Sequence, residues 1–363
     1  MTSEEGIPTA RTLSKLASQE GALAGGKPAA GPRNKIMLNL DLHLNQNLFE
    51  PTVERRPIRD GFGEALIELG ETNPNVVVLT ADLSESTRVE GFAKKFPERF
   101  FEVGVAEQNM IAIAAGLGVS GKIAFTSSYA VFSPGKNWET VRTTVAYNQS
   151  NVKIAGHHSG LLTGPDGATH QSTEDIALMR VLPEMIIFSP CDAIEAKELT
   201  LKAAQINGPV YLRLTRDKTP IITTEKTPFD INQIQTFWVN ENPKVTIFST
   251  GYLLYYALLA AKNLEKQGIE VLVANISTIK PSDEQTVIEL AEKSGKVVTV
   301  EDHQVAGGMG SMIAEVLSRT KPTPIEFVGL KDTFGQSGQP LELIKKYKLD
   351  DEAIEKAVRK ILA

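Results

Sequence analysis

The sequence has little of several features that would place it in a special class of protein. Its 363 residues include a single cysteine, Cys191, which excludes an internal disulfide framework and fits a reducing compartment. No run approaches the roughly 18 to 20 apolar residues that a membrane-spanning helix needs. The net charge of −6 comes from interspersed charges, without the basic stripe that nucleic-acid binding requires. We therefore expect a cytoplasmic globular protein that binds neither nucleic acid nor membrane.

Common catalytic and nucleotide-binding motifs are missing as well. The chain has no Walker sequence and no nucleophile elbow. GGMG at 307–310 opens a helical pattern, but it lacks the full dinucleotide fingerprint, so close packing of strand and helix is favoured over anion binding. No second group of histidine, cysteine and carboxylate residues completes a zinc set, so we predict no metal ligand in this chain.

The first fifty residues differ in composition from the rest. Residues 1–35 include GALAGGKPAAGPRNK and are expected to form a mobile arm, followed by a segment at 36–52 that is capable of docking. The start lacks the basic residues and apolar core of a secretory signal, and early acidic residues disfavour a transit peptide.

From about residue 57, short β-branched runs alternate with helical patterns. The runs are apolar throughout, which indicates parallel strands covered by helices on both faces. Expected strands are 75–82, 122–128, 151–158, 184–190 and 209–215, then 244–250, 270–276, 296–302 and 325–330. We predict two three-layer α/β/α domains with mostly parallel sheets, with these boundaries: a flexible arm at 1–52, a first domain at 53–222, a linker at 223–243 and a second domain at 244–363.

Polar residues gather at the expected carboxyl ends of the first domain's strands, where ligands bind in open parallel sheets. They are Asp82, Ser127, Ser128, His157, His158, Arg213 and Arg216. Arginines such as Arg59, Arg213 and Arg216 suit bidentate recognition of a phosphate if they converge, which their spacing does not show.

Glu107 lies in FEVGVAEQNM, immediately before an apolar helix of small residues. On its own, the more ordinary interpretation is a first-turn carboxylate favoured by the helix dipole. Close packing of that helix would partly desolvate the carboxylate and suit it to acid–base chemistry. The residues alone leave both interpretations open.

The loop HHSGLLTGPDGATHQ at 157–171 carries three of the five histidines and Asp166. Because side chains alternate along a strand, we expect only one of His157 and His158 to face a site. This composition at a strand end favours proton transfer or hydroxyl recognition over a loop of hydrogen-bonded histidines.

AEQNM and DGATHQ, taken together, resemble the transketolase family of thiamine-diphosphate enzymes. The resemblance runs from about Arg55 to the C-terminus and covers the family's pyrimidine-binding and C-terminal domains. The ordered segments are GFGEAL, TADLSES, FEVGVAEQNM, SSYAVF, GHHSGLLTGPDGATHQ, PCD and YLRLTRDKTP. Together they are highly specific.

The resemblance implies which residues contact the cofactor. Glu107 matches the acid that hydrogen-bonds the aminopyrimidine ring and favours the imino tautomer, which takes the proton from the thiazolium C2. Phe132, with Tyr129 one helical turn earlier, matches the aromatic residues beside the pyrimidine, and Asp82 and Leu83 match the adjoining wall.

The resemblance also implies a sugar-phosphate site. His158, His170 and Asp166 match residues that bind sugar hydroxyls and assist proton transfer. The residues that match the phosphate-holding groups are Arg59, Ser86 and Arg216. The implied reaction moves a two-carbon ketol unit from a ketose phosphate to an aldose phosphate, as in the pentose phosphate pathway (EC 2.2.1.1).

Some positions depart from the family pattern. The family often has His-Asp-Ser where this chain has His158-Ser159-Gly160. Tyr129 stands where phenylalanine is common, and Gly135 where an aromatic residue is often found. These departures concern the preferred sugar more than the cofactor chemistry.

The family's diphosphate-binding domain has no counterpart here, since the chain contains no Gly-Asp dipeptide and hence no Gly-Asp-Gly segment. We therefore expect one subunit of a split transketolase, in an α2β2 heterotetramer whose N-terminal subunit supplies most ligands of Mg²⁺ (or Ca²⁺). The rivals are a 1-deoxyxylulose-5-phosphate synthase-like subunit, a 2-oxoacid dehydrogenase β-like subunit, and a non-catalytic regulatory subunit of the same fold. Gln171 after His170 favours the transketolase form.

Overall fold

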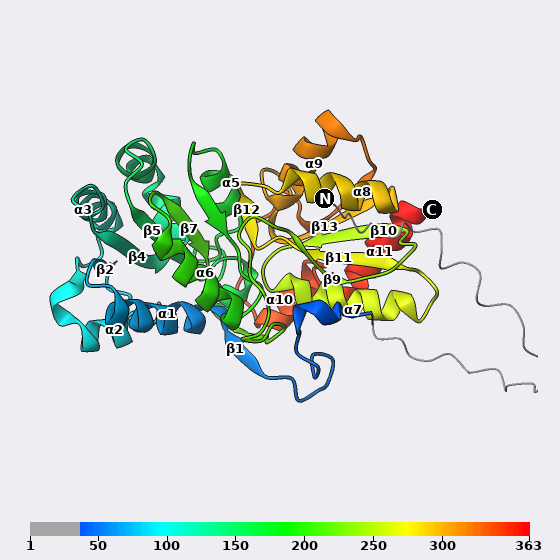
Figure 1. The fold of residues 1–363 in the computed structure, drawn as a ribbon, viewed down its shortest axis with the longest axis horizontal. Helices are drawn as coiled ribbons and strands as arrows, with labels where there is room; N and C mark the ends of the chain where they lie inside the picture. Colours follow the sequence, from blue (N-terminus) through cyan, green and yellow to red (C-terminus); the bar gives the residue numbers. More distant parts are fainter. Residues whose placement is uncertain (1–36) are drawn as a thin grey trace, which may run out of the picture. The chain divides into compact units, whose positions relative to one another are not determined.

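The computed structural model describes residues 37–363, which form two α/β/α layered domains (Figure 1). The first is built on a seven-stranded sheet in the order β12-β6-β7-β5-β4-β2-β3, in which all neighbours except β12 and β6 are parallel. Its strands are β2 (Val76–Thr80), β3 (Phe100–Glu102), β4 (Ile123–Tyr129), β5 (Val152–His157), β6 (Ile186–Phe188), β7 (Val210–Arg213) and β12 (Thr278–Lys280). Four of these strands fall within the expected runs 75–82, 151–158, 184–190 and 209–215, while β4 extends one residue beyond 122–128.

Helices cover both faces of this sheet. On one face α1 (Ile58–Thr72) packs against α6 (Ala193–Gln205), and a Cβ on Gly61 would lie 1.8 Å from the carbonyl oxygen of Ala193, so only glycine allows this approach. On the other face lie α3 (Glu107–Val119) and the helical segment η4 (Val141–Ala146). Shorter elements are α2 (Glu90–Lys95), η2 (Pro97–Arg99), η3 (Val131–Lys136), α4 (Trp138–Thr140), η5 (Leu161–Asp166) and α5 (Asp175–Arg180).

The second domain has a five-stranded sheet in the order β14-β13-β10-β11-β9. Its strands are β9 (Gln235–Trp238), β10 (Val245–Ser249), β11 (Val271–Asn275), β13 (Val297–Gln304) and β14 (Ile325–Leu330), of which only β9 is antiparallel. Its helices are α7 (Leu253–Glu265), α8 (Glu284–Ser294), α9 (Met309–Thr320), α10 (Pro340–Lys346) and α11 (Asp351–Leu362). The C-terminal domain thus repeats the layered plan of the first.

Among the strands outside the expected runs, β9 and β12 bear most on how the two domains are built. β9 falls inside the expected linker 223–243 and adds an antiparallel edge to the second sheet. β12 comes from the second half of the chain but pairs with β6 of the first sheet. A strand from the C-terminal part of the chain therefore forms one edge of the first sheet.

The segment expected to dock does lie against the rest of the protein from residue 37 onward. Leu38 forms an antiparallel bridge with Trp238, and the N–H of Asn45 donates to the carbonyl of Ile222 at 2.9 Å. Leu44 and Leu48 are buried there, next to the turn η1 (Leu40–Leu42). A short ladder of β1 (Arg55–Pro57) and β8 (Lys218–Pro220) then leads into the first domain. The expected mobile arm, residues 1–35, lies outside the described residues.

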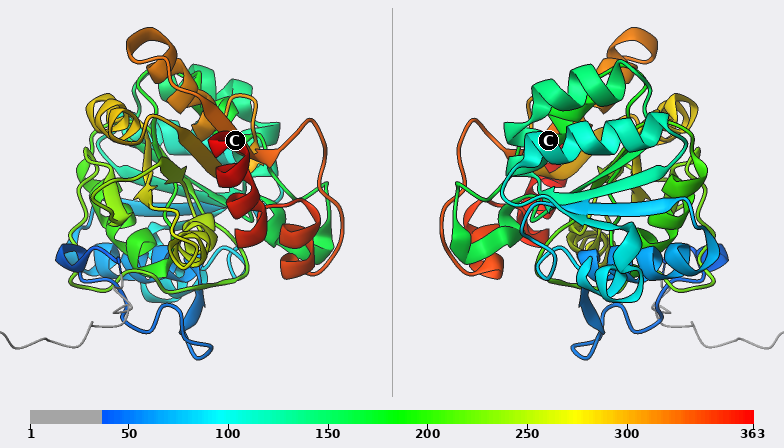
Figure 2. Two further views of the ribbon diagram at one scale, coloured as in Figure 1. Left: turned by 90° about the vertical axis from the view of Figure 1, so that its right-hand side faces the viewer. Right: turned by 90° about the vertical axis from the view of Figure 1, so that its left-hand side faces the viewer.

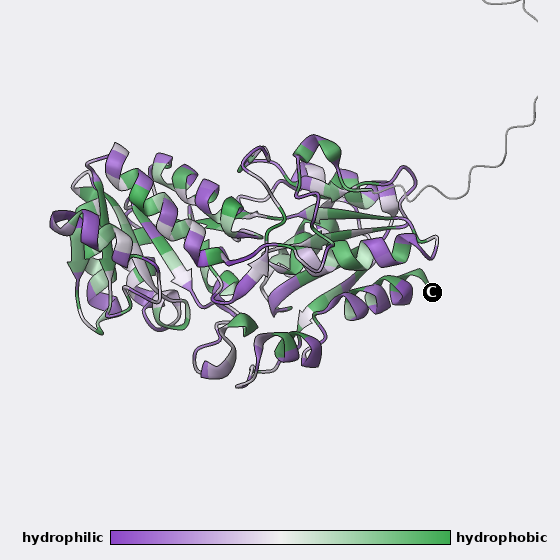
Figure 3. Ribbon diagram, turned by 90° about the horizontal axis from the view of Figure 1, so that it is seen from below, coloured by the Kyte–Doolittle hydropathy of each residue, from purple (hydrophilic) through white to green (hydrophobic). Residues whose placement is uncertain are grey.

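The buried core follows from the apolar runs. The strands are predominantly apolar, whereas polar residues lie along the outer faces of the helices (Figure 3). Each of the two hydrophobic clusters contains residues of both domains, so the layers continue from one sheet to the other. Within residues 37–363 no helix is long and apolar enough to cross a membrane.

Candidate active site

Glu107 is the first residue of α3 and is only 2% exposed. Its position at the helix N-terminus favours a negative charge, because the first N–H groups of a helix point toward it. The Nζ atom of Lys136 lies 3.1 Å from Oε2 of Glu107, and the side-chain amide of Asn137 donates to the Glu107 carbonyl at 2.9 Å. Because the Lys136 side chain is 57% exposed, it can leave the carboxylate at little energetic cost.

The element η3, whose last residue is Lys136, also carries Phe132 of a group of aromatic rings. Tyr129 is the last residue of β4, so the expectation that it lies one helical turn before Phe132 is wrong: the chain leaves the strand between them. Their rings are nearly parallel, with centroids 5.8 Å apart. Tyr129 also stacks on His158 at 3.7 Å, and Phe132 meets His170 edge-on at 5.5 Å. Four rings thus form one continuous group between η3 and the histidine loop.

The two adjacent histidines have different surroundings. His157 is buried within the first domain, with Nε2 2.9 Å from Oγ of Ser127. His158 adopts a left-handed backbone conformation (φ 54°) and lies with its Nε2 3.4 Å from Nη1 of Arg59. His158 thus contacts Arg59, whereas His157 contacts Ser127 inside the first domain.

The charge state of His158 follows from its environment. Burial, followed by the nearby charge of Arg59, lowers the pKa of His158 to about 2, so its imidazole is neutral at pH 7. Because a guanidinium only donates hydrogen bonds, the contact with Arg59 favours the tautomer with the proton on Nδ1. Nδ1 is buried and has no hydrogen-bond partner among the described residues.

A cationic pocket, here called the arginine pocket, adjoins His158 and has a volume of about 360 Å³. Burial, together with the charges of Arg88 and Arg216, lowers the pKa of Arg59 to about 10, so it stays protonated at pH 7 while being repelled by its neighbours. An anion in the pocket would relieve this repulsion. Its polar and charged lining residues are Arg59, Arg88, Arg216, Asp217, Lys218 and, from the C-terminal domain, Gln339.

Two of the expected phosphate-side residues help to shape this pocket. Arg59 donates from Nη1 to the carbonyl of Ser86 at 2.5 Å. Arg216 donates to the carbonyl of Thr163 at 2.7 Å, and its Nη1 lies 3.5 Å from a carboxylate oxygen of Asp166. The structure therefore brings Arg59, Ser86, Arg216 and Asp166 to one region.

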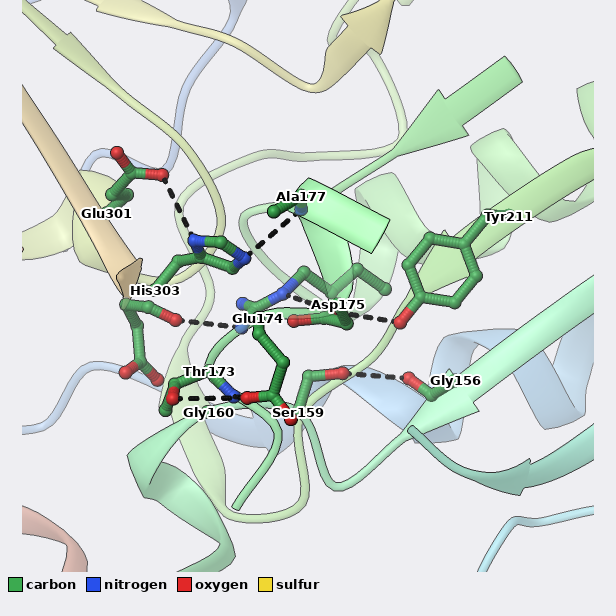
Figure 4. A network of polar contacts seen from close by, with 12 residues as sticks. Gly156, Ser159, Gly160, Thr173, Glu174, Asp175, Ala177, Tyr211, Glu301 and His303 are labelled. Atoms are coloured by element: carbon green, nitrogen blue, oxygen red, sulfur yellow. Dashed lines mark hydrogen bonds and ion pairs between the residues drawn. The ribbon is translucent and has the colours of Figure 1, made fainter. Parts of the chain in front are cut away.

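Arg213 does not join them. It is buried and donates from Nε to Oδ2 of Asp175 at 2.9 Å, on the side of β7 that faces the second domain. Arg213 therefore does not converge with Arg59 and Arg216 on the arginine pocket. Tyr211 donates to the same carboxylate oxygen at 2.7 Å (Figure 4).

Asp82 and Leu83 follow β2 after one intervening residue, Ala81, and the chain turns at Asp82 with φ 62°. The carboxylate of Glu102 accepts the N–H of Asp82 at 2.8 Å and that of Gly104 at 2.9 Å. These bonds fix the turn after β2 against the segment that leads from β3 to Glu107.

The glycine-rich segment 307–310 serves packing within the second domain. Glu301 accepts the N–H groups of Met309 and Gly310 at 2.7 and 2.9 Å, so the N-terminus of α9 already holds a carboxylate of this chain. Among residues 37–363 no group of three or more histidine, cysteine and carboxylate side chains is arranged to hold a metal ion.

Several residues of this region were not found from the sequence. Lys136, Asn137 and Arg88 follow recognised segments, but nothing in their spacing indicates a contact with Glu107 or Arg59. Gln339 is still less visible, because it reaches the arginine pocket from the other domain.

The fold and this site define a class of protein, and comparison with known proteins identifies it. Residues 55–221 match the transketolase pyrimidine binding domain, and residues 237–354 match the transketolase C-terminal domain. The chain belongs to the transketolase family, whose members are thiamine-diphosphate-dependent transferases, and it corresponds to the C-terminal part of a split transketolase.

Individual relatives make the correspondence more specific. The chain is 46% identical over 305 residues to a protein of Methanocaldococcus jannaschii named as a transketolase C-terminal section, covering 83% of this chain and 95% of the relative. It is 37% identical over 313 residues to a 6-deoxy-6-sulfo-D-fructose transketolase subunit of Clostridium sp. (strain MSTE9). This match covers 86% of this chain and 97% of the relative. A solved structure described as "Split gene transketolase, inactive beta4 tetramer" superposes with a TM-score of 0.78 at 45% identity. The superposition covers 84% of this chain and 98% of the solved chain. By contrast, the chain covers only 49% of human transketolase, at 31% identity.

Proposed function

We propose that this chain is the pyrimidine-binding subunit of a two-subunit transketolase, which moves a two-carbon ketol unit from a ketose phosphate to an aldose phosphate. The observation that carries the proposal is the arrangement at one edge of the first sheet. A buried carboxylate, Glu107, contacts Lys136 of η3, the element that also carries Phe132 of the ring group. His158 of the same ring group contacts Arg59, which lines the arginine pocket.

The residues around Glu107 suit one end of thiamine diphosphate. The cofactor, when bound, supplies the nucleophilic carbon that adds to a sugar carbonyl. Glu107 would hold the pyrimidine ring through a carboxylate–nitrogen hydrogen bond, replacing its contact with Lys136. Phe132 and Tyr129 would pack beside the ring, with Asp82 and Leu83 at the adjoining wall.

A neighbouring chain would hold the diphosphate end. We assign the Mg²⁺ (or Ca²⁺) that accompanies the diphosphate to a partner subunit, and we propose an α2β2 assembly. The names of two relatives support a division of the enzyme into two chains. One is named as a transketolase C-terminal section and the other as a transketolase subunit, and this chain covers 95% and 97% of their respective lengths.

The outer face of α3 fits such a partner. α3 is apolar on nearly all sides, and Ile113 and Val119 lie exposed on it. Val105, two residues before Glu107, is 72% exposed. A partner that covers these residues would bury apolar surface and close the cofactor site at the same time.

The histidine loop and the arginine pocket would hold the sugar. The neutral His158 can exchange a hydrogen bond with a sugar hydroxyl, and His170 and Asp166 lie on the same loop to assist proton transfer. The arginine pocket would bind the terminal phosphate through charge-assisted hydrogen bonds. The name of the Clostridium relative contains a sulfo sugar, whose anionic end would suit a pocket of the same kind.

The phosphate assignment predicts a strong preference for phosphorylated sugars. With the partner present, kcat/KM for a ketose phosphate is expected to exceed that for the same ketose without phosphate by on the order of 100-fold, because two or more charge-assisted hydrogen bonds are lost. Arg216→Gln should remove most of this preference, whereas Arg319→Gln on the exposed side of α9 should leave it intact. Equal rates with both sugars would contradict the assignment, and transfer from pyruvate instead of a ketose would contradict the ketol-transfer function.

A further inference from the structure

The contact between the two domains includes one carboxylate that touches the histidine loop directly. Asp302 on β13 is 2% exposed. Both of its carboxylate oxygens accept the backbone N–H of Leu161, at 2.9 and 3.2 Å. Leu161 is three residues after His158, so a side chain of the C-terminal domain holds the backbone of the candidate sugar site.

Other residues fix this carboxylate in place. Tyr252 donates its hydroxyl to Oδ2 of Asp302 at 2.8 Å, and Arg213 donates from Nη2 to the Asp302 backbone carbonyl at 2.7 Å. Arg213 in turn is held by Asp175, which also accepts from Tyr211 (Figure 4). Asp302 is therefore a fixed point within a buried polar network that joins β13, β7 and α5.

The loop is shaped to receive Asp302. Gly160 has a φ of 73°, and a Cβ at this position would lie 2.0 Å from Oδ2 of Asp302. Gly160, which replaces the serine of the family's His-Asp-Ser pattern, thus leaves room for the carboxylate of Asp302. Replacing it with any larger residue would force Asp302 and the loop apart.

The held backbone connects to the groups that face the sugar. Thr163, two residues beyond Leu161, donates its hydroxyl to the carbonyl of His158 at 2.6 Å. The carbonyl of Thr163 accepts from Arg216 at 2.7 Å. A displacement of Leu161 would therefore shift both the histidine and a wall of the arginine pocket.

The C-terminal domain supports the same loop at a second place. The side-chain amide of Gln171 donates to the carbonyl of Gln336 at 3.0 Å. The turn η5 packs against α10 (Figure 2, where the orange-red helix lies beside the green loop). The loop is thus held by the C-terminal domain near both of its ends.

We infer that Asp302 is a positioning residue of the sugar site: it acts through Leu161 to set the positions of His158 and Arg216, and so tunes affinity for the sugar phosphate without touching the cofactor. The effect of Asp302 on affinity for the sugar phosphate rests on the proposed function. Its effect on the backbone at Leu161 does not. The positioning role gives the C-terminal domain a part in substrate recognition.

Asp302→Asn tests the positioning role of Asp302. Asparagine keeps the shape of the aspartate side chain but offers one acceptor oxygen, whereas both carboxylate oxygens of Asp302 accept hydrogen bonds. In the enzyme reconstituted with its partner, KM for the phosphorylated ketose should rise on the order of 10-fold while kcat and thiamine-diphosphate affinity change little. Tyr252→Phe, which removes a single hydrogen bond to the same carboxylate, should raise KM in the same direction but less.

Glu301→Gln is the matched control. Glu301 precedes Asp302 on the same buried strand, but its carboxylate caps α9 within the second domain. This variant should lower thermal stability without raising KM. If Glu301→Gln raises KM as much as Asp302→Asn, or if Asp302→Asn and Tyr252→Phe lower only kcat, Asp302 does not position the sugar site.

A measurement on the chain alone separates this inference from the proposed function. Amide hydrogen exchange at Leu161 should accelerate at least about 10-fold in Asp302→Asn and stay unchanged in Glu301→Gln, because only the first variant weakens the bond that protects this amide. Unchanged exchange at Leu161 in Asp302→Asn would overturn the inference. Failure of the unsubstituted enzyme to use sugar phosphates would instead overturn the proposed function and leave the exchange result valid.

Discussion

Replacing Glu107 with glutamine is expected to lower turnover of the reconstituted enzyme by at least about 100-fold, the lower end of the usual contribution of a proton-transfer group. Glutamine fills the same space at the start of α3 but carries no negative charge. It cannot stabilise a protonated pyrimidine nitrogen, although it can still form a neutral hydrogen bond.

The result is measured as ketol transfer with saturating cofactor and a ketose/aldose pair. Assembly with the partner should be unchanged, because Glu107 is buried beneath the outer face of α3. Glu139→Gln, an exposed position in α4, is the matched control and should behave like the unsubstituted chain. If Glu107→Gln turns over within a factor of two of Glu139→Gln, the proposed role of the Glu107 carboxylate is wrong.

Placing a charge on the outer face of α3 is expected to prevent assembly with the partner. Ile113 is 37% exposed in this chain and would be covered in the proposed interface. Ile113→Glu would then bury an unpaired carboxylate, which should weaken association by on the order of 100-fold or more and abolish activity at low subunit concentration. Sedimentation of the mixed subunits measures the first effect directly.

Val181→Glu provides the comparison for this change. Val181 is 69% exposed next to the end of α5, and the same aliphatic-to-acid substitution there should leave association intact. Activity of Ile113→Glu should return as the partner concentration is raised, since the catalytic residues are untouched. Normal association of Ile113→Glu would show that the partner binds elsewhere.

The layered fold could be predicted because its strands are coded locally. Runs such as 75–82 and 325–330 are apolar and β-branched, and they form β2 and β14 close to the expected bounds. β12 could not be found in this way, because its three residues are defined by pairing with β6, about ninety positions earlier in the chain. Its existence depends on how the two domains pack.

The candidate site was predictable only in part, and for a similar reason. Glu107 had two open interpretations until the family motifs favoured one. Whether Arg213 converges with Arg59 and Arg216 stayed open, because alternation along β7 does not say which face lies against the second domain. Asp302 was invisible, since its partner Leu161 is 141 positions away and the contact depends on the interdomain arrangement.

The central claim is that this chain holds one half of an active site, with Glu107 at its edge. The most direct measurement is ketol transfer by the purified chain with thiamine diphosphate, Mg²⁺ and a ketose/aldose phosphate pair, with and without a partner that carries the Gly-Asp-Gly diphosphate-binding segment. We expect no turnover by the chain alone and restored turnover at equimolar partner. Robust turnover by the chain alone would contradict the central claim.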